Sequence, residues 1–139
     1  MKKLERWLAC VMILLLAGCA SLAPVATEPQ PPPRNEAVAA LFDLSRSQSA
    51  AGKLDMAGAS LERALRIEPQ NPELWQELAR VRLNQRQHRE AENFAAKANI
   101  LAGTDTQLRA ENWRIIGQAR TSLGDYQGAQ AAFEKAEGK

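Results

Sequence analysis

Apolar residues recur every three or four positions from about residue 36 onward, which is the spacing of amphipathic helices. Glycine and proline interrupt this pattern at short intervals. Asn71-Pro72 is a typical helix start, because asparagine caps free amides and proline suits the first helical turn. Thr104 and Gln107 fit a capping box before a later helix. The pattern predicts six helices, at about 36–51, 54–67, 72–85, 88–101, from 105 to a turn at 124, and 126–137.

Small and aromatic residues repeat from one pair of helices to the next. The second helix of each pair carries two alanines seven residues apart, and the step between pairs is 34 and then 38 residues. A Leu or Trp lies sixteen residues before the first alanine of each pair. The repeated residues are Leu41, Ala57 and Ala64, then Trp75, Ala91 and Ala98, then Trp113, Ala129 and Ala136. A period of this length indicates helix hairpins stacked in a row.

The third hairpin resembles a tetratricopeptide repeat, whose period is about 34 residues. The matching residues are Trp113, Gly117, Gly124, Tyr126, Ala129, Phe133 and Ala136. The first unit has Ser45 where the family has a small glycine, and the second has Arg86 at the turn glycine. The resemblance implies an all-α fold, a short right-handed α-solenoid of three hairpins at about 38–71, 72–105 and 110–139.

The repeated alanines are expected to be buried, because small side chains let neighbouring helices approach within about 8–10 Å. This expectation covers Ala91, Ala98, Ala129 and Ala136. Larger aromatic side chains are expected to fill the gaps between hairpins, namely Trp75, Phe94, Trp113 and Phe133.

Residues 1–18 have the features of a signal peptide, with positive charges followed by an apolar run from Leu8 to Ala17. This run is shorter than the roughly 20 residues of a membrane-spanning helix. Leu16-Ala17-Gly18-Cys19 resembles the bacterial lipobox, which implies that acyl chains such as palmitate are attached to Cys19. An ordinary signal peptide or a retained membrane anchor is the alternative.

Ala20 follows the lipobox cysteine, and by resemblance to lipoprotein sorting a residue other than Asp favours the outer membrane, with the body in the periplasm. Residues 19–35 hold five of the seven prolines and are expected to form a tether. At about 3.1 Å per residue it could extend to roughly 50 Å. The domain that follows is expected to span residues 36–139.

Charge and composition exclude several functional classes. Removing Lys2, Lys3, Arg6 and Glu5 with the signal leaves 15 basic and 15 acidic residues, so the excess charge that nucleic-acid binding requires is missing. Once Cys10 is removed and Cys19 is acylated, no thiol remains for a disulfide, a metal or catalysis. His88 is the only histidine and is expected to pack at a helix start. Neither an enzyme nor a bound cofactor or metal is expected.

The resemblance implies a groove that binds a protein or peptide along the first helix of each hairpin. By position, the lining residues would be Phe42, Arg46, Gln76, Arg80, Asn84, Arg114 and Gln118. Arginines on one face can pair with carboxylates in bidentate fashion. Phe42, Arg46 and Glu77 do not match the Lys and Asn pattern of the family members that clamp a chaperone's C-terminal carboxylate, so that ligand is not expected.

These features together predict an outer-membrane adaptor or scaffold for envelope proteins, such as cell-wall hydrolases or proteases. Two alternatives stay open: an assembly factor similar to the pilotins of type IV pilus secretins, and a structural subunit of an envelope complex. Because no capping helix follows the last hairpin, its outer edge is expected to dock a partner or a second copy, as in a homodimer. Alternatively, Gln127, Gln130, Ala131 and Glu134 make that edge polar enough by themselves.

Overall fold

The computed structural model describes residues 35–138, and every regular element in this range is an α-helix. The helices are α2 (Glu36–Ala50), α3 (Leu54–Ile67), α4 (Pro72–Asn84), α5 (His88–Leu101), α6 (Thr106–Leu123) and α7 (Tyr126–Ala136). The expected all-α solenoid of helix hairpins is therefore confirmed. The signal peptide, Cys19, Ala20 and the proline-rich tether up to residue 34 lie outside the described residues.

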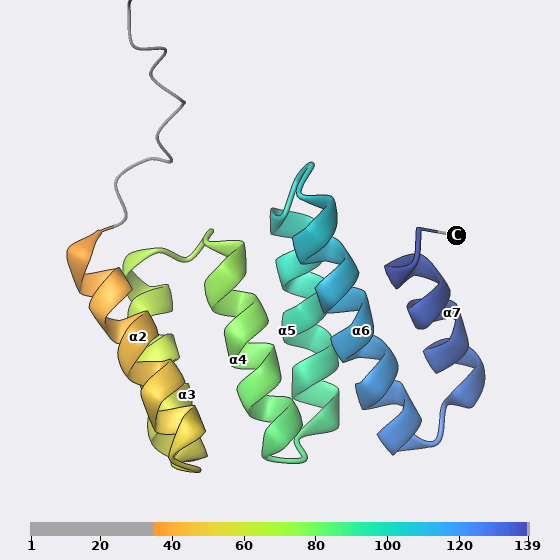
Figure 1. Ribbon diagram of the computed structural model, residues 1–139, viewed down its shortest axis with the longest axis horizontal. Helices are drawn as coiled ribbons and strands as arrows, with labels where there is room; N and C mark the ends of the chain where they lie inside the picture. The colour runs from red at the N-terminus through yellow and green to blue at the C-terminus, as the bar shows by residue number, and fades with distance from the viewer. Residues whose placement is uncertain (1–34, 139) are drawn as a thin grey trace, which may run out of the picture. The chain divides into compact units, whose positions relative to one another are not determined.

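The helices form three hairpins, α2 with α3, α4 with α5, and α6 with α7. Each helix packs against the next along the chain, and α4 also packs against α6 (Figure 1). This last contact brings the first helices of the second and third hairpins together on one face. The face between α4 and α6 is therefore where a groove can form.

Local sequence explains where the helices of this face begin. The side chain of Asn71 accepts hydrogen bonds from the backbone amides of Glu73 and Leu74, at 3.0 and 3.4 Å, and Pro72 opens α4 as expected. At the start of α6, Asp105 is the cap, and its carboxylate accepts from the Leu108 amide at 2.9 Å. The expected Thr104 cap is therefore wrong by one residue. With 18 residues α6 is the longest of the described helices, which accounts for the longer 38-residue step.

Small residues occupy equivalent buried positions in all three hairpins. The alanines of the second helices are buried as expected, with Ala91 and Ala98 fully enclosed and Ala129 and Ala136 nearly so. A second series lies in the first helices at Ser45, Ala79 and Gly117, which are 34 and 38 residues apart and all buried. In the first hairpin the hydroxyl of Ser45 donates to the Phe42 carbonyl oxygen at 2.7 Å, so the serine is satisfied inside its own helix.

The aromatic residues pack between hairpins to different extents. The rings of Trp75 and Phe94 lie 5.5 Å apart, as expected for gap-filling side chains. Phe133 lies over Gly117, where an added Cβ would come within 2.5 Å of the ring, but 36% of Phe133 stays exposed. Trp113 is half-buried, and the Lys135 ammonium lies 4.4 Å from the centre of its ring.

The turn inside each hairpin requires a left-handed residue. Gly52, Arg86 and Gly124 occupy equivalent turn positions and have φ angles of 73°, 63° and 84°. Arg86 is the only residue other than glycine with positive φ in the described range. A side chain at such a position is strained, because its Cβ crowds the backbone.

We expect Arg86→Gly to stabilise the fold. The left-handed conformation costs a non-glycine residue roughly 1–2 kcal/mol, and the greater freedom of glycine in the unfolded chain offsets about 0.5–1 kcal/mol of that gain. The free energy of unfolding should rise by about 0.5–1 kcal/mol, measured by urea denaturation. Gly52→Ala is the matched control: it has no neighbour within 4 Å to clash with, so strain alone should lower stability. Equal stability of all three proteins would contradict this account of the turns.

Candidate binding groove

Two adjoining clefts lie along the face between α4 and α6. The first cleft has a volume of about 220 Å³ and is lined by Phe42, Glu73, Gln76, Asp105, Gln107, Leu108 and Glu111. The second cleft has a volume of about 410 Å³ and is lined by Arg80, Leu83, Asn84, Glu111, Arg114, Ile115 and Gln118. Glu111 lines both clefts and forms the wall between them. We call the two clefts together the groove.

The structure brings together six of the seven residues that the sequence places in a groove. Phe42 and Gln76 line the first cleft. The second cleft contains Arg80, Asn84, Arg114 and Gln118. That these residues contact a partner stays a prediction, since the structure contains no partner.

Arg46 is the exception among the expected lining residues. It is exposed on α2 and lines neither cleft. The reason is the packing of α2, which lies mainly against α3, whereas α4 and α6 contact each other directly. The groove therefore narrows to the second and third hairpins, and Phe42 is the contribution of α2 to its first cleft.

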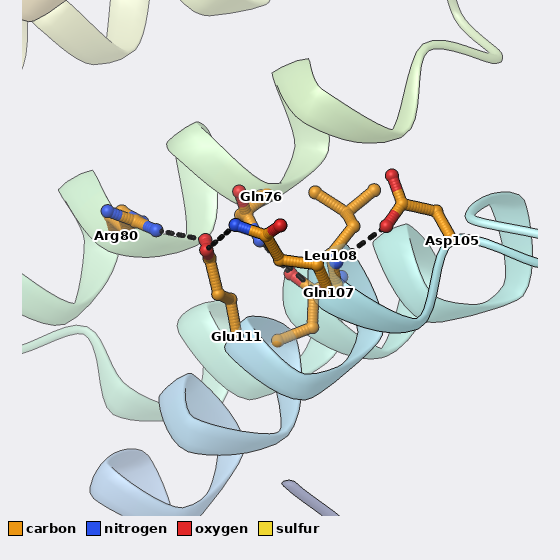
Figure 2. A network of polar contacts seen from close by, with 7 residues as sticks. Gln76, Arg80, Asp105, Gln107, Leu108 and Glu111 are labelled. Atoms are coloured by element: carbon orange, nitrogen blue, oxygen red, sulfur yellow. Dashed lines mark hydrogen bonds and ion pairs between the residues drawn. The ribbon is translucent and has the colours of Figure 1, made fainter.

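A buried polar network joins α4 to α6 beneath the first cleft. The Gln76 amide nitrogen donates to the Leu108 carbonyl oxygen at 3.3 Å and to Asn112 Oδ1 at 3.1 Å, linking the two helices (Figure 2). Gln76 is only 8% exposed and Asn112 is fully buried. Because buried polar groups are costly unless they are paired, this network fixes how α4 and α6 sit against each other.

A second contact crosses the groove at its surface. The Arg80 guanidinium lies 2.7 Å from the Glu111 carboxylate, and Gln107 Nε2 donates to the same carboxylate at 3.4 Å (Figure 2). The side chains of Arg80 and Glu111 are 47% and 30% exposed, so the ion pair contributes at most about 1 kcal/mol to stability. Its main consequence is to hold Arg80 at the boundary between the clefts.

The two clefts differ in charge. Three carboxylates line the first cleft, from Glu73, Asp105 and Glu111, and none of its lining residues is basic. In the second cleft two arginines, Arg80 and Arg114, face the single carboxylate of Glu111. The groove thus runs from an acidic to a basic end.

The acidic residues of α6 were not expected from the sequence. Glu111 lies three residues before Arg114 and seven before Gln118, so helical spacing could have placed it on the same face. Asp105 and Gln107 belong to the first turn of α6 and its cap, where the four extra residues obscure the match between repeats. The buried Asn112 was also missed, and no periodic signal distinguishes it from a surface asparagine.

The outer edge of the third hairpin carries a further cleft of about 310 Å³. It is lined by Thr106, Arg109, Ala110, Trp113, Lys135, Ala136, Glu137 and Gly138. Trp113 and Lys135 stack here, and Phe133 is partly exposed nearby on α7. Self-association through this edge stays a prediction.

Chemical groups for catalysis are sparse in the described part of the chain. Between residues 35 and 138 no group of three or more His, Cys, Asp or Glu side chains is placed to hold a metal ion. His88 begins α5 and is half-buried beside Arg86 and Gln87, away from the groove. Among the helices described here, none is both long and apolar enough to cross a membrane.

Two family models match the chain, and both describe the tetratricopeptide repeat. One covers residues 35–110 and the other residues 110–138. Together they span all six helices of the described range. Among curated protein sequences no match to this chain was found.

Two solved structures have similar folds. The globular C-terminal domain of LpoP from P. aeruginosa is 39% identical, with a TM-score of 0.72, and the match covers 74% of this chain and 97% of that one. The N-terminal domain of stress-induced protein-1 (STI-1) from C. elegans is 20% identical, with a TM-score of 0.69 and coverage of 74% and 84%. The second likeness concerns the fold alone.

Proposed function

The chain belongs to the tetratricopeptide repeat family, and from this premise we propose that it is an adaptor that holds an envelope protein in the groove between α4 and α6. The observation that carries the proposal is the groove itself. Two clefts adjoin on the face where repeats of this family bind peptides, and they contain Gln76, Arg80, Asn84, Arg114 and Gln118. Amides and guanidinium groups of this kind can bind the backbone and carboxylates of a partner.

We further propose that acyl chains on Cys19 anchor the protein in the outer membrane and that the repeats face the periplasm. The lipobox and Ala20 support this location. The likeness to LpoP supports it as well, because that protein is also described by a globular C-terminal domain and the repeats here follow an N-terminal segment. In this proposal the protein binds and positions its partner without catalysis or a cofactor.

Cys19→Ser is expected to release the protein from the membrane fraction. Each buried methylene of an acyl chain contributes roughly 0.8 kcal/mol to membrane binding, so several chains give stable anchoring and their loss removes it. Separation of the two membranes and immunoblotting would measure the distribution. A second variant, Ala20→Asp, should stay membrane-bound but move to the inner membrane. Membrane binding of Cys19→Ser equal to that of the native protein would contradict acylation as the anchor.

Crosslinking pull-down from intact cells tests the adaptor proposal. The native protein is compared with Arg80→Ala/Arg114→Ala, which removes both cations of the second cleft, and with Arg63→Ala/Arg66→Ala, which removes two exposed arginines of α3. We expect a partner that is lost only with the groove variant. A partner that survives the groove variant, or that is lost equally with the α3 control, would contradict binding in the groove.

The identity of the captured protein decides between the proposed classes. A cell-wall hydrolase or a protease would support the adaptor. A secretin would favour a pilotin-like assembly factor, whose deletion should abolish pilus assembly. Co-purification in fixed stoichiometry would favour a structural subunit. Capture of a second copy of this chain would support self-association through the last hairpin.

A further inference from the structure

A buried side chain presents an unpaired acceptor in the acidic first cleft. Both hydrogens of the Gln76 amide nitrogen are committed, one to the Leu108 carbonyl oxygen and one to Asn112 Oδ1. No described residue donates to Gln76 Oε1, although the residue is only 8% exposed and lines the cleft. A buried acceptor held in a fixed orientation suits a ligand that supplies a hydrogen-bond donor.

The surroundings of Gln76 favour a donor that is positively charged. The carboxylates of Asp105 and Glu111 line the same cleft, and no lining residue is basic. Phe42 and Leu108 supply apolar walls. A lysine or arginine side chain combines an apolar stem with a cationic head that only donates hydrogen bonds, so it matches both parts of the cleft.

The second cleft offers the opposite chemistry. Arg114 is exposed and makes no hydrogen bond or ion pair with the described residues, so its guanidinium is available to a ligand. The amides of Asn84 and Gln118 lie beside it. Arg80 is partly neutralised by Glu111, at the boundary with the first cleft. A carboxylate is the group that a planar guanidinium binds best.

We propose that the groove binds an extended peptide segment of the partner that carries a Lys or Arg side chain in the first cleft and an Asp or Glu side chain in the second. This inference rests on the proposed adaptor function and specifies the chemistry of its partner. The opposite charges of the clefts also fix the direction of the segment, because the reversed segment would place like charges together.

Helix geometry gives the spacing of the two charged side chains. Gln76 is four residues from Arg80 and eight from Asn84 on α4, which corresponds to about 6 and 12 Å along the helix. An extended peptide rises about 3.3 Å per residue. The basic and acidic side chains should therefore be about two to four residues apart, in one order only.

Selection from a displayed random-peptide library tests the inference with the full chain purified in detergent. The native protein is compared with Asp105→Asn/Glu111→Gln, which removes two charges of the first cleft but keeps polar side chains and a good helix cap. Arg114→Gln tests the second cleft separately. The control, Asp43→Asn/Glu134→Gln, removes two exposed carboxylates that lie outside the groove.

We expect the native protein and the control to select peptides with a basic residue two to four positions from an acidic one, in a constant order. Asp105→Asn/Glu111→Gln should lose the basic preference and keep the acidic one, and Arg114→Gln should do the reverse. The affinity of a selected peptide should fall about fivefold in each variant, and addition of salt should reduce the difference. Glu111→Gln alone, which leaves the α6 cap intact, should show the same loss of preference to a smaller extent.

Different outcomes overturn different claims. Selected peptides without a basic preference, or with the same preference in Asp105→Asn/Glu111→Gln, would overturn the inference and leave groove binding intact. Binding of the reversed sequence with equal affinity would overturn the fixed direction. Failure to select any peptide would overturn both the inference and the proposed peptide-binding function.

Discussion

Leu78→Ala is expected to lower the free energy of unfolding by about 2–5 kcal/mol, because it removes a buried side chain and leaves a cavity. Leu78 is 2% exposed on α4 and packs in a cluster with Val38, Leu61 and Leu74. Domains of this size are stable by about 5–15 kcal/mol, so the substitution removes a large share of the total. Thermal and urea denaturation would measure the loss, which should lower the melting temperature by at least about 10 °C.

The first hairpin contains a matched control for this change. Leu44 lies 34 residues before Leu78, at the equivalent position, but it is 45% exposed. Leu44→Ala should therefore cost less than about 1 kcal/mol, since little apolar area returns to water. Equal costs for the two substitutions would mean that the hairpins do not stack in the order α2 to α7 described here.

Gly117→Leu is expected to destabilise the third hairpin by about 2 kcal/mol, because the new side chain must displace the Phe133 ring. An added Cβ at Gly117 would lie 2.5 to 2.8 Å from three ring atoms. The ring is partly exposed and can turn outward, so the expected cost is lost packing between α6 and α7 and not complete unfolding. Urea denaturation would measure the change in stability.

A double-mutant cycle with Phe133→Ala identifies the cause of this loss. Without the ring, Gly117→Leu should cost much less, and leucine could even stabilise α6 because its helix propensity exceeds that of glycine by about 0.8 kcal/mol. The equivalent small residue Ala79 lies in the second hairpin and serves as a reference site. Additive effects of Gly117→Leu and Phe133→Ala would exclude the contact as the reason.

The hairpin architecture could be predicted from the sequence because its signals are local. The bounds of α3 and α5 match the expectation, since glycine, proline and the alanine spacing leave few alternatives. The cap of α6 was misplaced by one residue, because Thr104 and Asp105 are both suitable caps and their geometry decides. Arg86 was expected to replace a turn glycine, and its positive φ agrees.

The groove could be predicted only in part, because its chemistry depends on pairs of helices. Spacing along single helices placed Gln76, Arg80 and Arg114 on the groove side. It could not show that Arg80 pairs with Glu111 or that Gln76 is held by Asn112 from the next hairpin. Arg46 failed for the same reason, since its place in a groove depends on how closely α2 approaches α4.

Photo-crosslinking in living cells tests most directly that the groove is the working surface. A photoreactive benzoyl-phenylalanine is placed at Asn84 or Gln118, two exposed residues that line the second cleft. The matched control positions are Arg63 on α3 and Asn93 on α5, which are exposed outside the groove. We predict one adduct of the same size from both groove positions and none from the controls. Adducts at Arg63 or Asn93 without adducts at Asn84 or Gln118 would contradict the account.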